Sequence, residues 1–332
     1  MKNKYGKYLS FYSTRFPITF LCFRDKISIK AVLFMKKNNL KAWLYLLPAF
    51  IFLGFFTIYP LVDIFVYSFE ENFQFTREAT GIGFGNYGFV LNDEKFLSAV
   101  RNTLILVIIT VPLSTIIALL ISVGLNRIKF LRKIFETIFF LPYVTNTLAV
   151  GMVFMLLFNK ESSESVGIVN SILGVFGINA IDWVGPTSSY AAKMFVLCFY
   201  TIWYVMPFKI LVLTGAIASV RKDYYQAAAV DGASRFTVFK RITVPMISPM
   251  ISYLIITGFI GAFKSYSDAV ALFGEDLDSA GMNTIVGYVY NQLYSNTGGY
   301  PSRASAAAII LFFIILAITC INLLVSRKHV HY

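Results

Sequence analysis

The chain has 332 residues, of which 57% are hydrophobic, 17% are aromatic and only 14% are charged. Soluble proteins carry about 25% charged residues, so this composition excludes an ordinary soluble domain and indicates a membrane protein with several spans. The formal net charge of +12 is compatible with nucleic-acid binding until the positions of the basic residues are considered.

Residues 1–41 form a basic extension in which Asp25 is the one acid. The apolar run 16–23 is too short to span a bilayer, although it is compatible with an interfacial helix. Met35 and the two lysines after it resemble a natural protein start directly before the first span. We therefore expect residues 1–34 to be dispensable.

Six apolar segments follow, each long enough to cross about 30 Å of hydrocarbon as a helix. The predicted spans are residues 42–69, 102–125, 134–158, 191–217, 247–273 and 304–325. We expect Pro207 to interrupt the fourth span. The predicted fold is an all-α polytopic membrane protein, with residues 42–326 as the transmembrane domain and residues 327–332 as a tail.

The lysines and arginines indicate the orientation of the spans. Of the 29 lysines and arginines, 22 lie on the side of the membrane that holds the N-terminus, if all the basic residues in 209–246 are counted there. Cytoplasmic connections are rich in these residues, so we expect both termini and the connection 218–246 in the cytoplasm, and the chain in the cell membrane. The basic charge then reflects topology, and no nucleic-acid partner is expected.

The sequence predicts neither catalysis nor a metal centre. The three cysteines are isolated, and His329 and His331 lie at the extreme C-terminus. No glycine-rich phosphate-binding loop ending in Gly-Lys-Ser/Thr occurs, so we expect the chain to bind no ATP and to have no cofactor of its own.

Residues 226–245 are polar and basic although long apolar segments flank them. Residues 227–229 favour a helix, and Gly232 can adopt the positive φ that ends one. Apolar residues then recur at intervals of three, which predicts a second short helix that Pro245 stops. These apolar positions are Phe236, Phe239 and Ile242.

This stretch resembles the EAA coupling loop of ABC-importer permeases, in which Glu-Ala-Ala, a glycine and Ile-x-Leu-Pro recur at fixed spacing. The spacing matches without gaps, with Gln226 in place of glutamate and Val244 in place of leucine. The first change removes a charge, which puts an ion pair with the ATPase in doubt. The residues to which the resemblance gives ATPase coupling are Gln226, Ala227, Ala228, Asp231, Gly232, Arg235, Phe239, Ile242 and Pro245.

Further stretches resemble the sugar-permease branch of this family. They are Phe84-Gly85-Asn86-Tyr87, Arg101-Asn102-Thr103-Leu104, Phe139-Phe140-Leu141-Pro142-Tyr143 and Tyr224-Tyr225-Gln226-Ala227-Ala228. The resemblance implies a type I (MetI-like) permease core of six transmembrane helices with a cytoplasmic coupling helix. It also implies membrane lipid around the chain, a second permease subunit, two ABC ATPases that bind ATP and magnesium, an external solute-binding protein and a carbohydrate substrate.

Polar and aromatic residues in the fourth and fifth spans are candidates for the substrate path. A charge inside a bilayer costs about 2.5–3.5 kcal/mol on insertion scales and needs a reason. Lys264 and Asp268 are four residues apart, which predicts one helix face, although Lys264 also fits a lysine that extends to the outer interface. Aromatic residues here also fit a lipid-facing belt. The candidate path residues are Trp203, Tyr204, Lys264, Tyr266, Ser267 and Asp268.

Other functions remain open at this point. The same importer class also carries glycerol phosphate and other polar solutes. An ion-coupled secondary transporter would use Asp63, Lys264 and Asp268, but it needs no ATPase-docking loop, and the two halves of the chain show no convincing repeat. A membrane-embedded enzyme lacks the site chemistry.

Overall fold

The computed structural model describes residues 41, 43–128, 132–160, 167–294 and 299–329. The predicted extension up to residue 40 therefore lies outside the described residues, as does the end of the tail. The chain divides into two compact units, of which the first ends at Asp63 and the second covers Ile64–Tyr332. Each unit is described by itself.

The first span is helical over Trp43–Phe69 and contains a five-residue π-helical segment, η1 (Gly54–Ile58), followed by α2 (Tyr59–Phe69). The N–H of Tyr59 donates to the carbonyl of Gly54. Pro60 follows immediately and has no N–H to continue the usual ladder, so the helix widens rather than ends. Its large apolar side chains are exposed, as in a helix that faces lipid.

After the end of α2, the second unit contains a short antiparallel hairpin of β1 (Glu70–Glu71) and β2 (Gly81–Ile82), with Glu70 opposite Ile82. Helix α3 (Gly85–Asn92) follows. The side-chain amide of Asn86 donates to the carbonyls of Ser68 and Glu70, at 3.1 and 3.0 Å. This buried amide fixes the hairpin to the start of α3.

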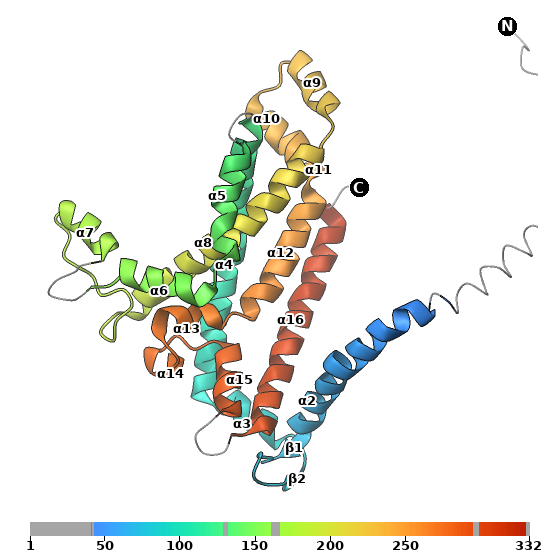
Figure 1. Cartoon of the computed structure of the whole chain (residues 1–332), viewed down its shortest axis with the longest axis vertical. Helices are drawn as coiled ribbons and strands as arrows, with labels where there is room; N and C mark the ends of the chain where they lie inside the picture. The colour runs from blue at the N-terminus through green and yellow to red at the C-terminus, as the bar shows by residue number, and fades with distance from the viewer. Residues whose placement is uncertain (1–40, 42, 129–131, 161–166, 295–298, 330–332) are drawn as a thin grey trace, which may run out of the picture. The chain divides into compact units, whose positions relative to one another are not determined.

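The second unit is built on long helices: α4 (Glu94–Arg127), α8 (Tyr190–Ser219), α12 (Ser248–Phe263) and α16 (Pro301–His329). Helix α4 packs along α8 and against α12, and α16 packs against α12 (Figure 1). The predicted interruption at Pro207 is wrong, because α8 is continuous. A proline removes one backbone hydrogen bond, and the long contact with α4 holds the remaining turns in place.

Two apolar helix pairs are sharply bent. Helices α5 (Arg132–Val144) and α6 (Thr147–Leu157) bend by 104°, and the side chain of Asn146 caps α6 by accepting from two backbone N–H groups. The pair that ends in α12 bends by 67°. The described residues thus contain four helices long and apolar enough to span a membrane, or six if each bent pair is one span.

Shorter helices complete the second unit: α7 (Ile168–Val175), α13 (Ser267–Phe273), α14 (Leu277–Ala280) and α15 (Ile285–Leu293). Helix α13 packs on α6, and α15 packs on α16 and α4. Sequence patterns did not predict α7 or α15. Tyr200, Tyr288 and Phe96 are among the largest fully buried side chains, and they lie on α8, α15 and α4.

Candidate functional site

A helix–turn–helix segment, residues 222–246, lies at one end of the long helices, and α3 and α15 lie toward the other (Figure 1). Its elements are α9 (Lys222–Val230), α10 (Arg235–Val238), a π-helical segment η2 (Phe239–Thr243) and α11 (Val244–Met246). The two helices expected from the sequence are therefore present.

The turn after α9 is a Schellman motif. The N–H of Ala233 donates to the carbonyl of Ala228 at 2.9 Å, and the N–H of Gly232 donates to Ala229 at 3.2 Å. Gly232 has φ +68, the left-handed conformation that glycine adopts without strain. Ser234 then caps α10 by accepting from the N–H of Thr237. The predicted positive φ of Gly232 at the end of the first helix is confirmed.

Pro245 does not stop the second helix as predicted. The N–H of Val244 donates to the carbonyl of Phe239, so the helix widens before the proline and continues to Met246. The same response precedes Pro60 in the first span. The axis turns at Ile247, where φ is −99 and ψ is 6, and Pro249 in the first turn of α12 has no N–H to continue the hydrogen-bond ladder across the bend.

The predicted coupling residues differ in exposure. Phe236 is 71% exposed, and Val230, which was not predicted, is 88% exposed. The predicted apolar stripe is therefore unevenly exposed, because Phe239 and Ile242 are half-buried. Of the rest, Ala228 is buried, Pro245 is half-buried, and Gln226, Ala227, Asp231, Gly232 and Arg235 are exposed.

An interhelical cavity of about 250 Å³ lies between α4, α8 and α12. Lys209 lines it and is 4% exposed, so the structure places this lysine inside α8 rather than in a connection, where the charge count had put it. The lining residues are Thr110, Val111, Ser114, Tyr143, Thr201, Val205, Phe208, Lys209, Leu254, Thr257, Gly258, Gly261, Ala262, Ser265 and Asp268.

The polar groups of the interhelical cavity come from distant parts of the chain. Asp268 accepts from Ser265 Oγ at 3.1 Å and from Thr147 Oγ1 at 3.3 Å. Thr110 Oγ1 is buried and has no hydrogen-bond partner among the described residues. A buried hydroxyl without a partner beside a cavity suits a polar ligand or water.

Lys264 and Asp268 do not share a helix face, which corrects the prediction. Helix α12 ends at Phe263 and α13 begins at Ser267, because the backbone at Tyr266 is non-helical, with φ −144 and ψ −54. Lys264 is exposed, whereas the Asp268 carboxylate binds two hydroxyls.

Of the six candidate path residues, Asp268 lines the interhelical cavity and the other five do not. The Trp203 ring lies 5.0 Å from Phe154, and the Tyr266 ring lies 5.2 Å from Tyr290. Tyr204 lies 6.3 Å from Tyr143, which does line the cavity. Sequence analysis missed Thr110 and Ser114, although hydroxyl residues inside an apolar span were a usable signal.

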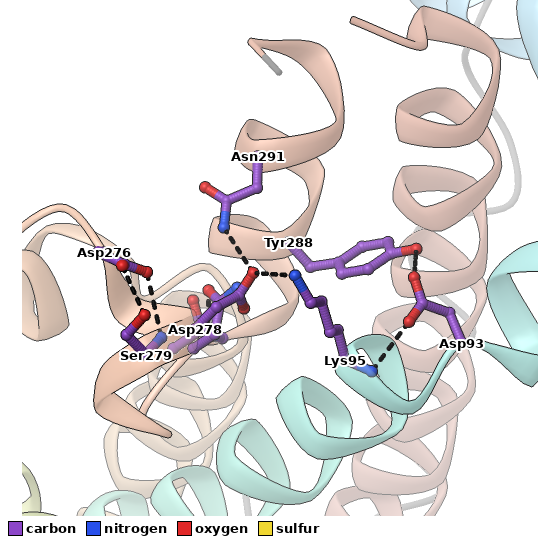
Figure 2. Close-up of polar contacts among 9 residues, drawn as sticks. Asp93, Lys95, Asp276, Asp278, Ser279, Tyr288 and Asn291 are labelled. Carbon is purple, nitrogen blue, oxygen red and sulfur yellow. Dashed lines mark hydrogen bonds and ion pairs between the residues drawn. The ribbon is translucent and has the colours of Figure 1, made fainter. Parts of the chain in front are cut away.

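Near the other end of α4, Asp278 anchors the connection between α13 and α15 (Figure 2). It pairs with Lys95 at 3.5 Å and accepts from the amides of Asn283 and Asn291. Asp93, which caps α4, accepts from Tyr288 at 2.7 Å.

Further hydrogen bonds tie this connection to α4 and α8. The Asn102 amide donates to the carbonyls of Gly281 and Asn283 at 3.0 and 2.9 Å. Lys193 Nζ on α8 donates to the carbonyl of Ala280 at 3.1 Å. The connection is therefore held at several points and is not a free loop.

Residues 111–329 match the family described as binding-protein-dependent transport system inner membrane component. The chain belongs to this family. It is thus a transport permease subunit and a multi-pass membrane protein.

Relatives support the resemblance to sugar permeases. The arabinooligosaccharides transport system permease protein AraP of Bacillus subtilis is 31% identical over 297 residues, which cover 86% of this chain and 89% of that protein. The trehalose/maltose transport system permease protein MalF of Thermococcus litoralis is 29% identical, with 86% and 93% covered. The resemblance to the sugar-permease branch of ABC importers is confirmed.

A chain from the crystal structure of a bacterial ABC transporter that imports the acidic polysaccharide alginate has the same fold. Its TM-score is 0.75 at 23% identity, over 90% of this chain and 99% of that chain. A related structure of a bacterial alginate transporter contains a periplasmic protein bound to an alginate pentasaccharide.

Proposed function

We propose that this chain forms half of the translocation path for a carbohydrate in an ATP-driven, binding-protein-dependent importer. Its partners are a second homologous permease subunit, two ABC ATPases that bind ATP and magnesium, and a solute-binding protein outside the cell. The bent pair of α5 and α6 forms one span and α12 forms another, which makes six with the four long helices, and both termini and the helix–turn–helix segment face the cytoplasm.

The helix–turn–helix segment is the observation that carries this proposal. Val230 and Phe236, the two highly exposed apolar side chains beside the Gly232 turn, offer an apolar surface that suits a protein partner. The Schellman turn gives this surface a fixed shape. Because the chain belongs to a family of transport permease subunits, we assign this surface to an ATPase subunit.

The interhelical cavity supports a carbohydrate path. Tyr143 and Phe208 offer ring faces that suit the C–H surfaces of a sugar, while Thr110, Thr201 and Asp268 suit its hydroxyl groups. We assign Asp268 to the path directly. Trp203, Tyr204, Lys264, Tyr266 and Ser267 would act around the cavity rather than in it.

Charge in the cavity favours a neutral polyol over a phosphate such as glycerol phosphate. The lining contains one basic side chain, Lys209, and one acidic side chain, Asp268, so their formal charges cancel. The Lys209 ammonium already donates hydrogen bonds to three acceptors on α4. A phosphate would have to displace those contacts and lie near the carboxylate.

The test is uptake of labelled arabino- and malto-oligosaccharides into vesicles that contain the assembled importer. We expect uptake to require ATP, the ATPases and the binding protein together. Uptake that follows a sodium or proton gradient without the ATPases would instead support a secondary transporter and overturn the proposal. Competition by glycerol phosphate but not by sugars would overturn the substrate class alone.

A further inference from the structure

A second cavity lies between the ends of α4 and α8 and the helix–turn–helix segment. It has a volume of about 600 Å³. We name it the basic cavity. Its lining residues are Val123, Asn126, Arg127, Ile217, Ala218, Val220, Lys222, Tyr225, Ala229, Ala233, Arg235, Val238, Phe239 and Thr243.

Three cations line the basic cavity, and each comes from a different element. Arg127 ends α4, Lys222 begins α9, and Arg235 begins α10. None of the described residues that line the cavity is an aspartate or a glutamate. Like charges around one space repel each other, so an anion in the cavity lowers the energy of all three.

Nearby acids do not neutralise these cations. The carboxylate of Asp223 pairs with Arg221 at 2.7 Å, and neither residue lines the cavity. Asp231 caps the end of α9 and is also outside the lining.

The rest of the lining is suited to an anion with an apolar part. Val123, Ile217 and Phe239 supply apolar surface. The Asn126 amide is fixed by donating to the carbonyls of Ser122 and Thr214, at 3.0 and 3.3 Å. The wall is therefore held at the junction of α4 and α8.

The basic cavity overlaps only in part with the expected ATPase-coupling residues, of which Arg235 and Phe239 line it. Val230 and Phe236, the exposed apolar residues assigned to ATPase docking, do not line the cavity, whereas Ala229 and Val238 do. A ligand in the cavity therefore leaves the exposed side chains of Val230 and Phe236 open to a partner protein.

We propose that the basic cavity binds a phosphate group, carried by a lipid headgroup or by a soluble phosphate compound. Arginine binds phosphate through two parallel N–H donors, and lysine adds a point charge. The bound group connects the end of α4 to both helices of the helix–turn–helix segment. It thereby sets the position of that segment relative to the spans.

The experiment uses the full chain, extracted from membranes with its associated subunits, and compares two charge-matched variants. The cavity variant is Arg127→Gln with Lys222→Gln. The control variant is Lys240→Gln with Arg241→Gln, which removes two exposed charges from the same segment outside the cavity. Binding is measured with inorganic phosphate at constant ionic strength, and separately with phosphatidylglycerol against phosphatidylcholine by native mass spectrometry.

We expect the wild type and the control variant to bind alike, and the cavity variant to bind about tenfold more weakly for each cation removed. Binding of phosphatidylglycerol alone supports a lipid source, and binding of inorganic phosphate by itself supports a soluble one. Equal losses in both variants would mean general surface charge and would overturn the proposal. The proposal would also be overturned if no anion bound to the wild type and only the cavity variant lost ATPase association. An acidic side chain of the partner would then fill the cavity.

This inference goes beyond the proposed function, and its readout needs no transport. Anion binding can therefore fail while sugar uptake stands. Conversely, a chain that imports no sugar would still bind phosphate.

Discussion

The Nζ atom of Lys209 on α8 lies 2.7 Å from Oγ of Ser114 and 2.9 Å from Oγ1 of Thr115, both on α4. A third contact, at 3.2 Å, is made to the carbonyl of Val111. All three of these partners are neutral. An ammonium inside a membrane is unfavourable by itself, so these contacts offset its cost and join the two most extensively packed helices.

Removing the charge should therefore disturb folding less than removing its acceptors. Lys209→Met deletes the ammonium, while Ser114 and Thr115 keep their hydrogen bonds to backbone carbonyls on α4. We expect its free energy of unfolding to change by less than about 1 kcal/mol. Ser114→Ala with Thr115→Val leaves the charge one partner and should cost at least about 2 kcal/mol.

Thermal unfolding of the extracted protein checks this order. Thr214→Val is the control, because the buried Thr214 hydroxyl has no hydrogen-bond partner among the described residues and its loss should be neutral. A larger loss for Lys209→Met than for the Ser114 and Thr115 double variant would show that the lysine is a net stabilising residue.

Gly232→Leu should abolish transport while leaving the protein in the membrane. A Cβ at this position meets no atom within 4 Å, so the cost is the backbone conformation alone, about 1–2 kcal/mol. Gly232→Asn should be milder, because asparagine tolerates a positive φ. Uptake and membrane content are measured together, and wild-type uptake by Gly232→Leu would remove the coupling role from this turn.

Asp268→Asn should weaken sugar uptake, because the carboxylate lines the interhelical cavity. Loss of one hydrogen bond to a charged group costs about 1–3 kcal/mol, or roughly 5- to 150-fold. Lys264→Met should retain uptake within about twofold, since the side chain is exposed and can reach an interface. If Lys264→Met lost more uptake than Asp268→Asn, the path would instead lie on the exposed side of the connection between α12 and α13.

The connection before α8 should open in acid. Burial raises the pKa of Asp182, but hydrogen bonds from Thr187 and Gly185 and the charge of Lys160 outweigh it, so the pKa lies below its ordinary value of 3.8. Because the folded-state pKa is the lower one, the stabilisation is present above about pH 4 and is lost as the pH falls through the folded-state pKa.

Fluorescence of Trp183, next to Asp182, reports this opening in a background with Trp43→Phe and Trp203→Phe. We expect an emission change below about pH 4 in the otherwise unmodified chain. Asp182→Asn should show the opened emission at neutral pH and no acid transition. An identical acid transition in both proteins would assign the change to another group.

Asp278→Ala should destabilise the connection between α13 and α15 more than Lys95→Ala does. Lys95 is largely exposed, and an exposed ion pair contributes about 0–1 kcal/mol. Asp278 also accepts from Asn283 and Asn291, whose amides would lose their acceptor. Hydrogen exchange of residues 277–285 measures the difference. Equal effects would mean that the ion pair, and not the amide contacts, holds the connection.

The sequence by itself determined the class of the protein and the turn at Gly232. Long apolar segments must form helices in a bilayer, because no other local structure satisfies the backbone there. The turn is also local, since its two hydrogen bonds join residues 228–233. The response to proline was not predictable in this way: at Pro60 and Pro245 the helix widened and continued, while at Pro207 packing against α4 kept α8 intact.

The tertiary structure alone decided which polar residues meet. Thr110, Lys209 and Asp268 are far apart in the chain and line one cavity, whereas Lys264 and Asp268, four residues apart, are separated by a helix break. The same holds for Arg127, Lys222 and Arg235 in the basic cavity. Helix periodicity fixes the face of one helix on which a side chain lies, but the neighbour of that face depends on how several helices pack together.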